Sequence, residues 1–234
     1  MVNVPAGSVH SKSLGQISAG SFLLAKFEVS RNQWQRVQAW VNNATKSKYD
    51  PFTALVSDAD TAGLPVAGVS WYEAVRWCNA LSEMEGLTPV YLKSDGISVW
   101  RKGEPGHLRR NRTADGYRLP TEAEWELAYR AGRQSKFFWG DEETIETVSR
   151  YGWYTKNADK KPRPVGTVEP NPLGLYDMAG NVSEWCWDAV AGTYRIWRGG
   201  SCATYPDELA ASCRHSHGLA SVGVPDVGFR IARN

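Results

Sequence analysis

Three stretches of the chain place apolar residues at helical spacing directly behind a pair of polar residues that can cap a helix. In each, a Ser or Thr is followed three residues later by Gln or Glu, and the two side chains can bond each other's backbone amides. The stretches begin at Ser30, Ser70 and Thr121, and Gly86 and Gly132 follow the second and third. The sequence therefore predicts three short helices, whose apolar faces include Trp34, Val37, Val41, Trp71, Cys78, Leu81, Trp125 and Ala128.

After Gly132 the pattern changes, because Gly, Pro or Asn interrupts the chain every few residues. Short β-prone pieces remain between the breaks, at residues 195–197 and 228–232. This part predicts strands and loops and no further helix. Helices early and short strands late, without regular alternation, favour an α+β fold, and we expect residues 1–234 to form a single domain.

The composition is that of an ordinary globular protein, with 234 residues, 42% apolar and 22% charged side chains. Disorder is excluded, and no apolar run approaches the roughly 20 residues that a membrane helix needs. The net charge of +2 gives no general attraction to nucleic acid or anionic lipid, so neither is an expected partner. A basic cluster at residues 101–112 lies among glycines and prolines and indicates a solvated loop.

Four cysteines are too few for a disulfide framework and lack the CxxC spacing of zinc and redox sites. The first residues, Met1 to Pro5, have neither the charged start nor the apolar core of a signal peptide. We therefore expect no signal peptide in this chain.

Five motifs, spread over nearly the whole chain, resemble in residue type and order the formylglycine-generating-enzyme (sulfatase-modifying-factor) family. They are PVAGVSW at 65–71, GYRLPTEAEWE at 116–126, NPLGLYDMAGNVSEW at 171–185, RGGS at 198–201 and GFR at 228–230. The resemblance implies a C-type-lectin-type fold of the formylglycine-generating-enzyme subclass. Such a domain is loop-rich with few regular elements, and its ligand surface is built from the C-terminal third. Arg118 and Glu184, charged residues among large apolar ones, are expected to be paired and structural.

The family's enzymes bind Cu(I) with two cysteines, three and eight residues after the serine of Gly-Gly-Ser, and oxidise a substrate cysteine with O₂. Here those positions are Thr204 and Leu209, while Cys202 and Cys213 fall outside the pair. Neither Thr nor Leu supplies the thiolate that Cu(I) prefers, so we expect no formylglycine-generating activity and no enzyme. The alternative is a divergent enzyme of the formylglycine-generating or iron-dependent sulfoxide-synthase type.

Calcium is the one cofactor that the resemblance implies, and no other is required. The family's ligands map to the side chains of Asp177 and Glu184 and to the carbonyls of Gly180 and Val182. Two carboxylates and two carbonyls suit a hard cation. The alternative, in which both carboxylates simply bond backbone amides, is equally open.

The segment from Leu209 to Gly228 contains no Glu, Lys, Gln, Met or Trp. These five amino acids cannot be produced by replacing adenines in an Asn codon, whereas the types present can. Adenine-specific mutagenesis marks diversity-generating retroelements, and the chain resembles their variable proteins, in particular a treponemal surface lipoprotein. The alternative is that a short Gly- and Ser-rich loop lacks long polar residues by chance.

The sequence therefore predicts a surface-displayed, non-catalytic protein whose residues 198–230 bind a macromolecule, either a protein or a host or microbial surface. A pseudoenzyme with one fixed partner is a further alternative. The resemblance implies a cell-surface or outer-membrane lipoprotein whose lipid anchor is absent from this chain. The expected ligand-binding residues are Ser183, Tyr194, Thr204, Tyr205, His215, His217, Leu219, Ser221, Val222, Val224 and Asp226. The frame residues Trp125, Trp185, Arg198 and Phe229 are expected to be buried.

Overall fold

The computed structural model describes residues 1–43, 48–52, 63–214 and 217–234. The α-helices of this part of the chain are α1 (Arg31–Asn42), α2 (Trp71–Met84), α3 (Glu122–Arg130) and α4 (Ile145–Tyr151). The first three begin where the sequence predicts, and each has a complete capping box formed with Gln33, Glu73 or Glu124. The prediction of these helices is confirmed, because capping is a local interaction that neighbouring residues make by themselves.

Helix α4 corrects the expectation that no helix follows Gly132. Its N-cap Thr144 accepts a hydrogen bond from the backbone amide of Thr147, whose own side chain cannot complete a capping box. The helix has only seven residues and one buried apolar residue, Val148. The sequence pattern therefore lacks both the capping pair and an apolar stripe long enough to indicate a helix.

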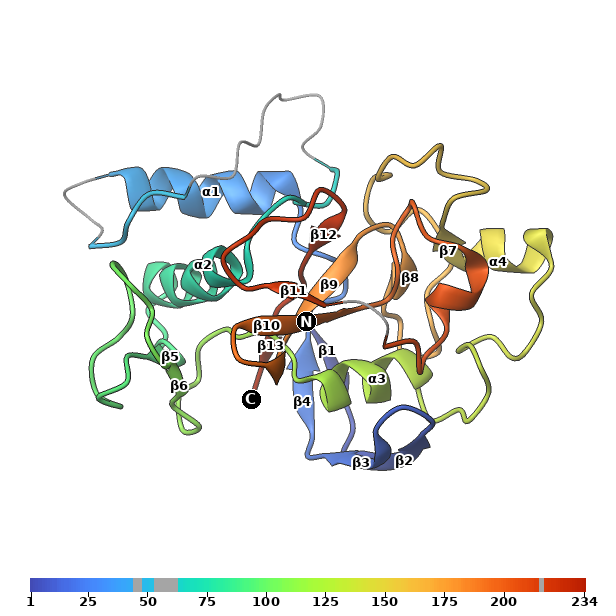
Figure 1. Cartoon of the computed structure of the whole chain (residues 1–234), viewed down its shortest axis with the longest axis horizontal. Helices are drawn as coiled ribbons and strands as arrows, with labels where there is room; N and C mark the ends of the chain where they lie inside the picture. Colours follow the sequence, from blue (N-terminus) through green and yellow to red (C-terminus); the bar gives the residue numbers. More distant parts are fainter. Residues whose placement is uncertain (44–47, 53–62, 215–216) are drawn as a thin grey trace.

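The strands form several small sheets, most of them antiparallel (Figure 1). The three-stranded sheet has the order β1 (Val2–Val4), β4 (Phe22–Leu24), β13 (Ala232–Arg233). The four-stranded sheet has the order β11 (His217–Leu219), β10 (Tyr194–Arg198), β9 (Ser183–Ala191), β12 (Val227–Gly228), and β12 pairs parallel to β9. The two-stranded pairs are β2 (Gly7–Ser11) with β3 (Gly15–Ala19), β5 (Tyr91–Leu92) with β6 (Arg109–Arg110), and β7 (Gly152–Trp153) with β8 (Ala179–Gly180). A short 3₁₀ helix, η2 (Pro206–Leu209), precedes β11. This is the predicted α+β fold.

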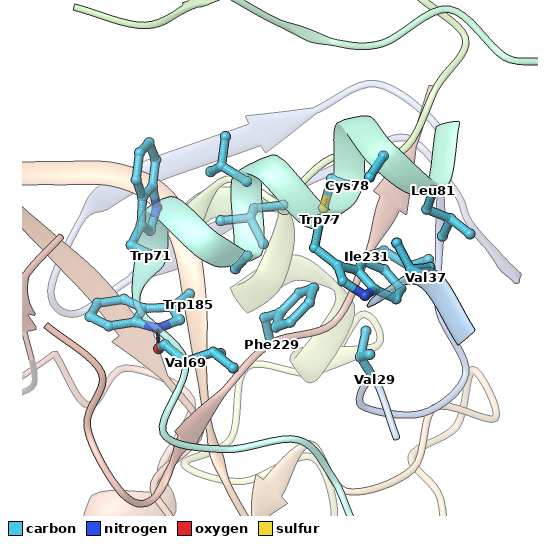
Figure 2. Close-up of a cluster of buried hydrophobic side chains, with 14 of the residues drawn as sticks. Val29, Val37, Val69, Trp71, Trp77, Cys78, Leu81, Trp185, Phe229 and Ile231 are labelled. Carbon is cyan, nitrogen blue, oxygen red and sulfur yellow. Dashed lines mark hydrogen bonds between the residues drawn. The ribbon is translucent and has the colours of Figure 1, made fainter. Parts of the chain in front are cut away.

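One hydrophobic core surrounds α2, and Figure 2 shows its central side chains. The Trp77 ring meets Phe229 edge to face at 5.4 Å, and the Trp185 indole N–H donates to the carbonyl of Val69 at 3.0 Å. Phe229 and Trp185 come from the C-terminal third of the chain, so this core joins the last strands to α2. Both are fully buried, as the sequence predicts for frame residues.

A second hydrophobic core lies around α3 and contains Trp125, Tyr129, Leu175 and Leu209. Trp125 is fully buried, and its indole N–H donates to Glu184 at 2.7 Å. No helix among the described residues is long and apolar enough to cross a membrane.

Candidate ligand-binding site

Arg198, at the end of β10, connects residues 211–213, which follow η2, to helix α3 by hydrogen bonds. Its guanidinium is buried and donates to the carboxylate of Glu126 at 2.7 Å. It also donates to the carbonyls of Ala211 and Cys213, at 2.5 and 2.7 Å. The carboxylates offset the cost of burying the cation, and the carbonyl bonds fix the backbone path of residues 211–213. The expectation that Arg198 is a buried frame residue is confirmed.

The backbone of residues 217–228 is held from two sides. Strand β11 pairs with β10, and the carbonyl of Ala220 accepts the amide of Tyr72 at the start of α2. On the other side, the backbone of this segment lies close to the backbone at Gly68. A Cβ at Gly223 would lie 2.0 Å from the carbonyl oxygen of Gly68. At Gly228 the same atom would lie 2.2 Å from the carbonyl oxygen of Val66. Only glycine fits at these two positions.

Six of the expected ligand-binding side chains are exposed on this fixed backbone. Tyr194 and Leu219 face each other across the β10–β11 pair, and the ring of His217 lies edge-on to Tyr194 at 5.7 Å. The exposed six are Tyr194, Tyr205, His217, Leu219, Ser221 and Val222. Tyr205 stands apart from the other five, because the η2 segment that it precedes packs on the second core through Leu209.

The other expected contacts are more enclosed. Thr204 is half-buried, and its hydroxyl donates to the carbonyl of Ser201 at 3.0 Å. Asp226 is half-buried and accepts the hydroxyl of Ser201 at 2.5 Å, while Val224 is half-buried against the first core. His215 lies outside the described residues.

Ser183 requires a correction, because it is buried rather than exposed. Only 3% of its surface is accessible, and its amide donates to the carbonyl of Asp226 at 2.9 Å. It lies at the point where β12 covers β9, a parallel pairing that the sequence does not indicate. We remove Ser183 from the ligand-binding set.

The positions of the family's copper thiols converge around Gly200. A Cβ at Gly200 would lie 2.8 Å both from the Oγ1 of Thr204 and from a Cδ of Leu209. The place therefore holds a hydroxyl and a buried isobutyl group. Cys202 lies beside it in sequence, and burial raises the pKa of its thiol to about 11, so the thiolate is scarce at neutral pH.

Asp177 and Glu184 belong to one buried group of charges with Glu28 and Arg230. The two oxygens of Glu184 accept the Arg230 guanidinium at 2.6 and 2.7 Å. One oxygen of Asp177 accepts the Gly166 amide at 2.6 Å, and the other is buried without a partner among the described residues. Burial raises the pKa of Asp177 to about 6. Burial, together with the charges of Asp177 and Glu184, also raises the pKa of Glu28 well above its ordinary value.

This geometry fits the implied calcium site only in part. The free oxygen of Asp177 is a possible ligand, whereas Glu184 is occupied by Arg230 and by the Trp125 indole. Between the two expected carbonyl ligands, Gly180 and Val182, the side chain of Asn181 donates to Glu28 at 2.6 Å. Among the residues described, no cluster of three His, Cys, Asp or Glu side chains could hold a metal. Calcium binding at Asp177 stays a prediction.

Two residues of these sites escaped the sequence analysis. Glu28 accepts Asn181 and the amide of Val182, more than 150 residues away in sequence, and no local pattern reveals such a contact. Val190 is 48% exposed on β9, one residue before Ala191, which pairs with Tyr194 of β10. The sequence could have indicated it only as an apolar residue among Ala and Gly near a turn, and this pattern alone is weak evidence for an exposed binding residue.

Comparisons with known proteins define the family. The sequence profile of the sulfatase-modifying factor enzyme 1-like domain matches residues 1–234. The chain belongs to this family. It is 31% identical to the chaperone protein LppX of Paenibacillus barcinonensis over 97% of this chain and 85% of that protein. It is 40% identical to the formylglycine-generating enzyme of Streptomyces coelicolor over 76% of this chain, and the match spans 65% of that enzyme's length.

The structural comparison agrees with the family assignment. Variable protein 1 of Treponema denticola has a TM-score of 0.82 with this chain and 28% sequence identity. The match covers all of this chain and 94% of the other. This chain therefore has the same fold as the variable protein of Treponema denticola.

Proposed function

We propose that this family member is a non-catalytic, surface-displayed binding protein whose residues 198–230 are diversified by a retroelement and contact a macromolecular ligand. One observation carries the proposal: large apolar side chains are exposed within residues 198–230 and on the adjoining β9–β10 pair. Of the eight such side chains in the described part of the chain, Tyr205, Leu219 and Val222 lie within residues 198–230, and Val190 and Tyr194 lie on β9 and β10. Exposed apolar groups on a rigid frame mark interaction surfaces.

The likeness to the Treponema denticola variable protein supports the same reading, because it extends over the whole chain. The frame also suits diversification. Arg198 bonds to the backbone carbonyls of residues 211 and 213, so these bonds do not depend on the side chains there, although Ala211 is itself buried in the second core and belongs to the frame. A site of this kind separates the residues that hold the fold from those that meet the ligand.

The absence of catalysis is part of the proposal. The two positions around Gly200 that would need thiolates for Cu(I) carry Thr204 and Leu209. A divergent enzyme would have to use other groups there, and the pKa of Cys202, raised to about 11, makes it a poor nucleophile at neutral pH.

A display library tests the binding function. Codons for Tyr194, Tyr205, His217, Leu219, Ser221 and Val222 are randomised, and the pool is selected on several purified proteins. We expect folded binders to different targets. A matched library at six exposed positions elsewhere (Ile97, Glu104, Glu142, Ile145, Lys156 and Lys160) serves as control. Equal numbers of binders from both libraries, or none from the first, would contradict the proposal.

The diversification itself has a separate test at the gene. A reverse transcriptase and a near-identical template repeat beside the coding sequence are expected. A neighbourhood without either would leave a binding protein with a fixed ligand.

A chaperone function is a second candidate, favoured by the relative from Paenibacillus barcinonensis, of which this chain covers 85%. A chaperone would protect many unfolded clients, whereas the proposed display protein binds one folded ligand per variant. Suppression of the thermal aggregation of an unrelated protein, such as citrate synthase, at equimolar concentration would favour the chaperone.

A further inference from the structure

Positive charge is concentrated in one short segment of the chain. Residues 93–112 contain six Lys and Arg residues and two Asp and Glu residues, which gives this segment a net charge of +4. Because the whole chain has a net charge of +2, all the other residues together have a net charge of −2. The small total predicts no attraction to nucleic acid or anionic lipid, but a local excess of this size indicates an anionic partner at this segment.

The segment lies on β5, β6 and the turns beside them, at the end of the molecule away from α4 (Figure 1). An open groove of about 620 Å³ is found here, and none of its described lining residues is acidic. Arg109 and Arg112 line the groove, and both are exposed and have no ion pair among the described residues. Arg110 contributes less, because it is half-buried over the Trp187 ring at 5.8 Å. The two exposed arginines are therefore accessible positive charges.

An aliphatic side chain projects beside these arginines. Ile97, which also lines the groove, is 83% exposed, the largest exposed fraction among the large apolar side chains of the described part of the chain. Hydrogen bonds close its turn, because the Asp95 carboxylate accepts the amides of Ile97 and Ser98, both at 2.9 Å. The stem of Arg109 packs on the same turn, since a Cβ at Gly96 would lie 3.6 Å from the Arg109 Cδ. A single exposed isoleucine needs no explanation, but an isoleucine and an exposed arginine held side by side form an amphipathic surface.

This combination fits an anionic lipid surface better than other anionic partners. A compact anion such as free phosphate is bound best by donors fixed around one point, whereas Arg109 and Arg112 are exposed and have no ion pair among the described residues to fix them. Nucleic-acid bases and protein partners favour exposed aromatic rings, and the exposed large aromatic side chains of the described residues, Tyr194 and Tyr205, lie outside residues 88–112. A lipid surface offers many phosphates beside an apolar layer and so accommodates separated arginines together with an isoleucine.

We propose that Ile97, Arg109 and Arg112 form a basic face that binds the surface of an anionic lipid bilayer. The two guanidinium groups contact headgroup phosphates, and the Ile97 side chain enters the boundary between headgroups and acyl chains. This contact uses residues outside 198–230, so it is separate from the proposed ligand-binding function.

Sedimentation with sucrose-loaded vesicles tests the basic face. We expect the partition coefficient on vesicles of phosphatidylglycerol and phosphatidylcholine in equal parts to be at least tenfold higher than on pure phosphatidylcholine, and to fall with added salt. Arg109→Gln and Arg112→Gln should each lower it about fivefold, the effect of one positive charge near such a surface, and Ile97→Ser should lower it at least threefold. Arg133→Gln and Ile145→Ser are matched controls at exposed positions outside the segment and should change it by less than twofold.

A second measurement uses the wild-type protein and does not depend on the folding of any variant. In nanodiscs that contain a nitroxide-labelled lipid, the methyl signal of Ile97 should broaden, whereas that of Ile145, which is 66% exposed, should not.

Equal partitioning onto neutral vesicles, equal losses in the control variants, or an unbroadened Ile97 signal would overturn the proposal. Tighter binding of single-stranded DNA or of an acidic protein than of vesicles would assign the face to that partner instead. Millimolar phosphate that displaces the vesicles more strongly than chloride of equal ionic strength would indicate a discrete anion site. Failure of the vesicle experiment together with success of the display library would reject the lipid contact and leave the proposed function intact.

Discussion

At the scale of single residues, Asp177 gives the chain a specific pH dependence. Its pKa is about 6 in the folded protein because of burial, against about 3.9 in an unfolded chain. Between pH 4 and 6 the folded state therefore binds a proton that the unfolded state has lost, and stability falls as pH rises through this window. The shift corresponds to about 3 kcal/mol. The raised pKa of Glu28 acts in the same direction.

Urea unfolding in EDTA at pH 4.5 and 7.5 measures this dependence. Asp177→Asn should reduce this dependence and leave the contribution of Glu28, because the amide does not titrate, whereas a variant with the wild-type slope would contradict the assignment. A second measurement adds millimolar Ca²⁺ at pH 7.5. A metal bound to the unpartnered oxygen of Asp177 would raise the melting temperature of the wild-type protein through ligand linkage, and it would leave the melting temperature of Asp177→Asn unchanged.

Gly223 lies in the segment expected to vary, and its substitution tests whether the backbone there tolerates a side chain. A Cβ at this position would lie 2.0 Å from the backbone oxygen of Gly68, so Gly223→Ala should destabilise the protein by roughly 1–3 kcal/mol. Ser221→Ala is the matched control, because Ser221 is exposed, and should cost less than about 0.5 kcal/mol. Denaturant midpoints give both values. If Gly223→Ala were as stable as the control, the backbone approach that fixes this loop would be wrong.

At the scale of elements, α3 and the β9–β10 pair form the frame and β11 carries part of the surface. Simultaneous replacement of Tyr205, His217, Leu219 and Val222 by Ser should leave the melting temperature nearly unchanged, because all four are exposed. Trp125→Ala, in contrast, empties a fully buried site and removes the bond to Glu184, at a cost of roughly 3–5 kcal/mol. Differential scanning calorimetry compares the two. A quadruple variant as unstable as Trp125→Ala would refute the division into frame and surface.

The same scale shows what the sequence could predict. The starts of α1, α2 and α3 follow from residues three apart, and the burial of Trp125, Trp185 and Phe229 follows from their size and apolarity. The burial of Ser183 depends on β12, and the role of Glu28 depends on Asn181. These contacts join segments that are far apart in the sequence, so no periodic pattern of residues predicts them. The exposure of β11 residues was predicted for a different reason, namely the set of amino-acid types absent from residues 209–228, which is a feature of composition and not a folding rule.

At the scale of the whole molecule, membership of the family and the expected lack of its copper chemistry are compatible, because the buried polar contacts of the frame do not use the side chains at the two thiol positions, although Leu209 packs in the second core. The frame residues Arg198, Glu126 and Trp125 form the buried contacts described above without either position. The protein is therefore expected to keep the fold while lacking the oxidase reaction.

Incubation with a cysteine-containing sulfatase peptide, Cu(I) and O₂ tests this expectation. No aldehyde should form, as measured by hydrazide labelling of the peptide, because Thr204 and Leu209 supply no thiolate around Gly200. The double variant Thr204→Cys, Leu209→Cys is the informative companion. Both positions lie against Gly200, so the two thiols should bind one Cu(I) ion with nanomolar or tighter affinity in a competition titration, whereas the wild type should not. Aldehyde formation by the wild-type protein would show that catalysis here uses a different set of residues, and the non-catalytic proposal would fall.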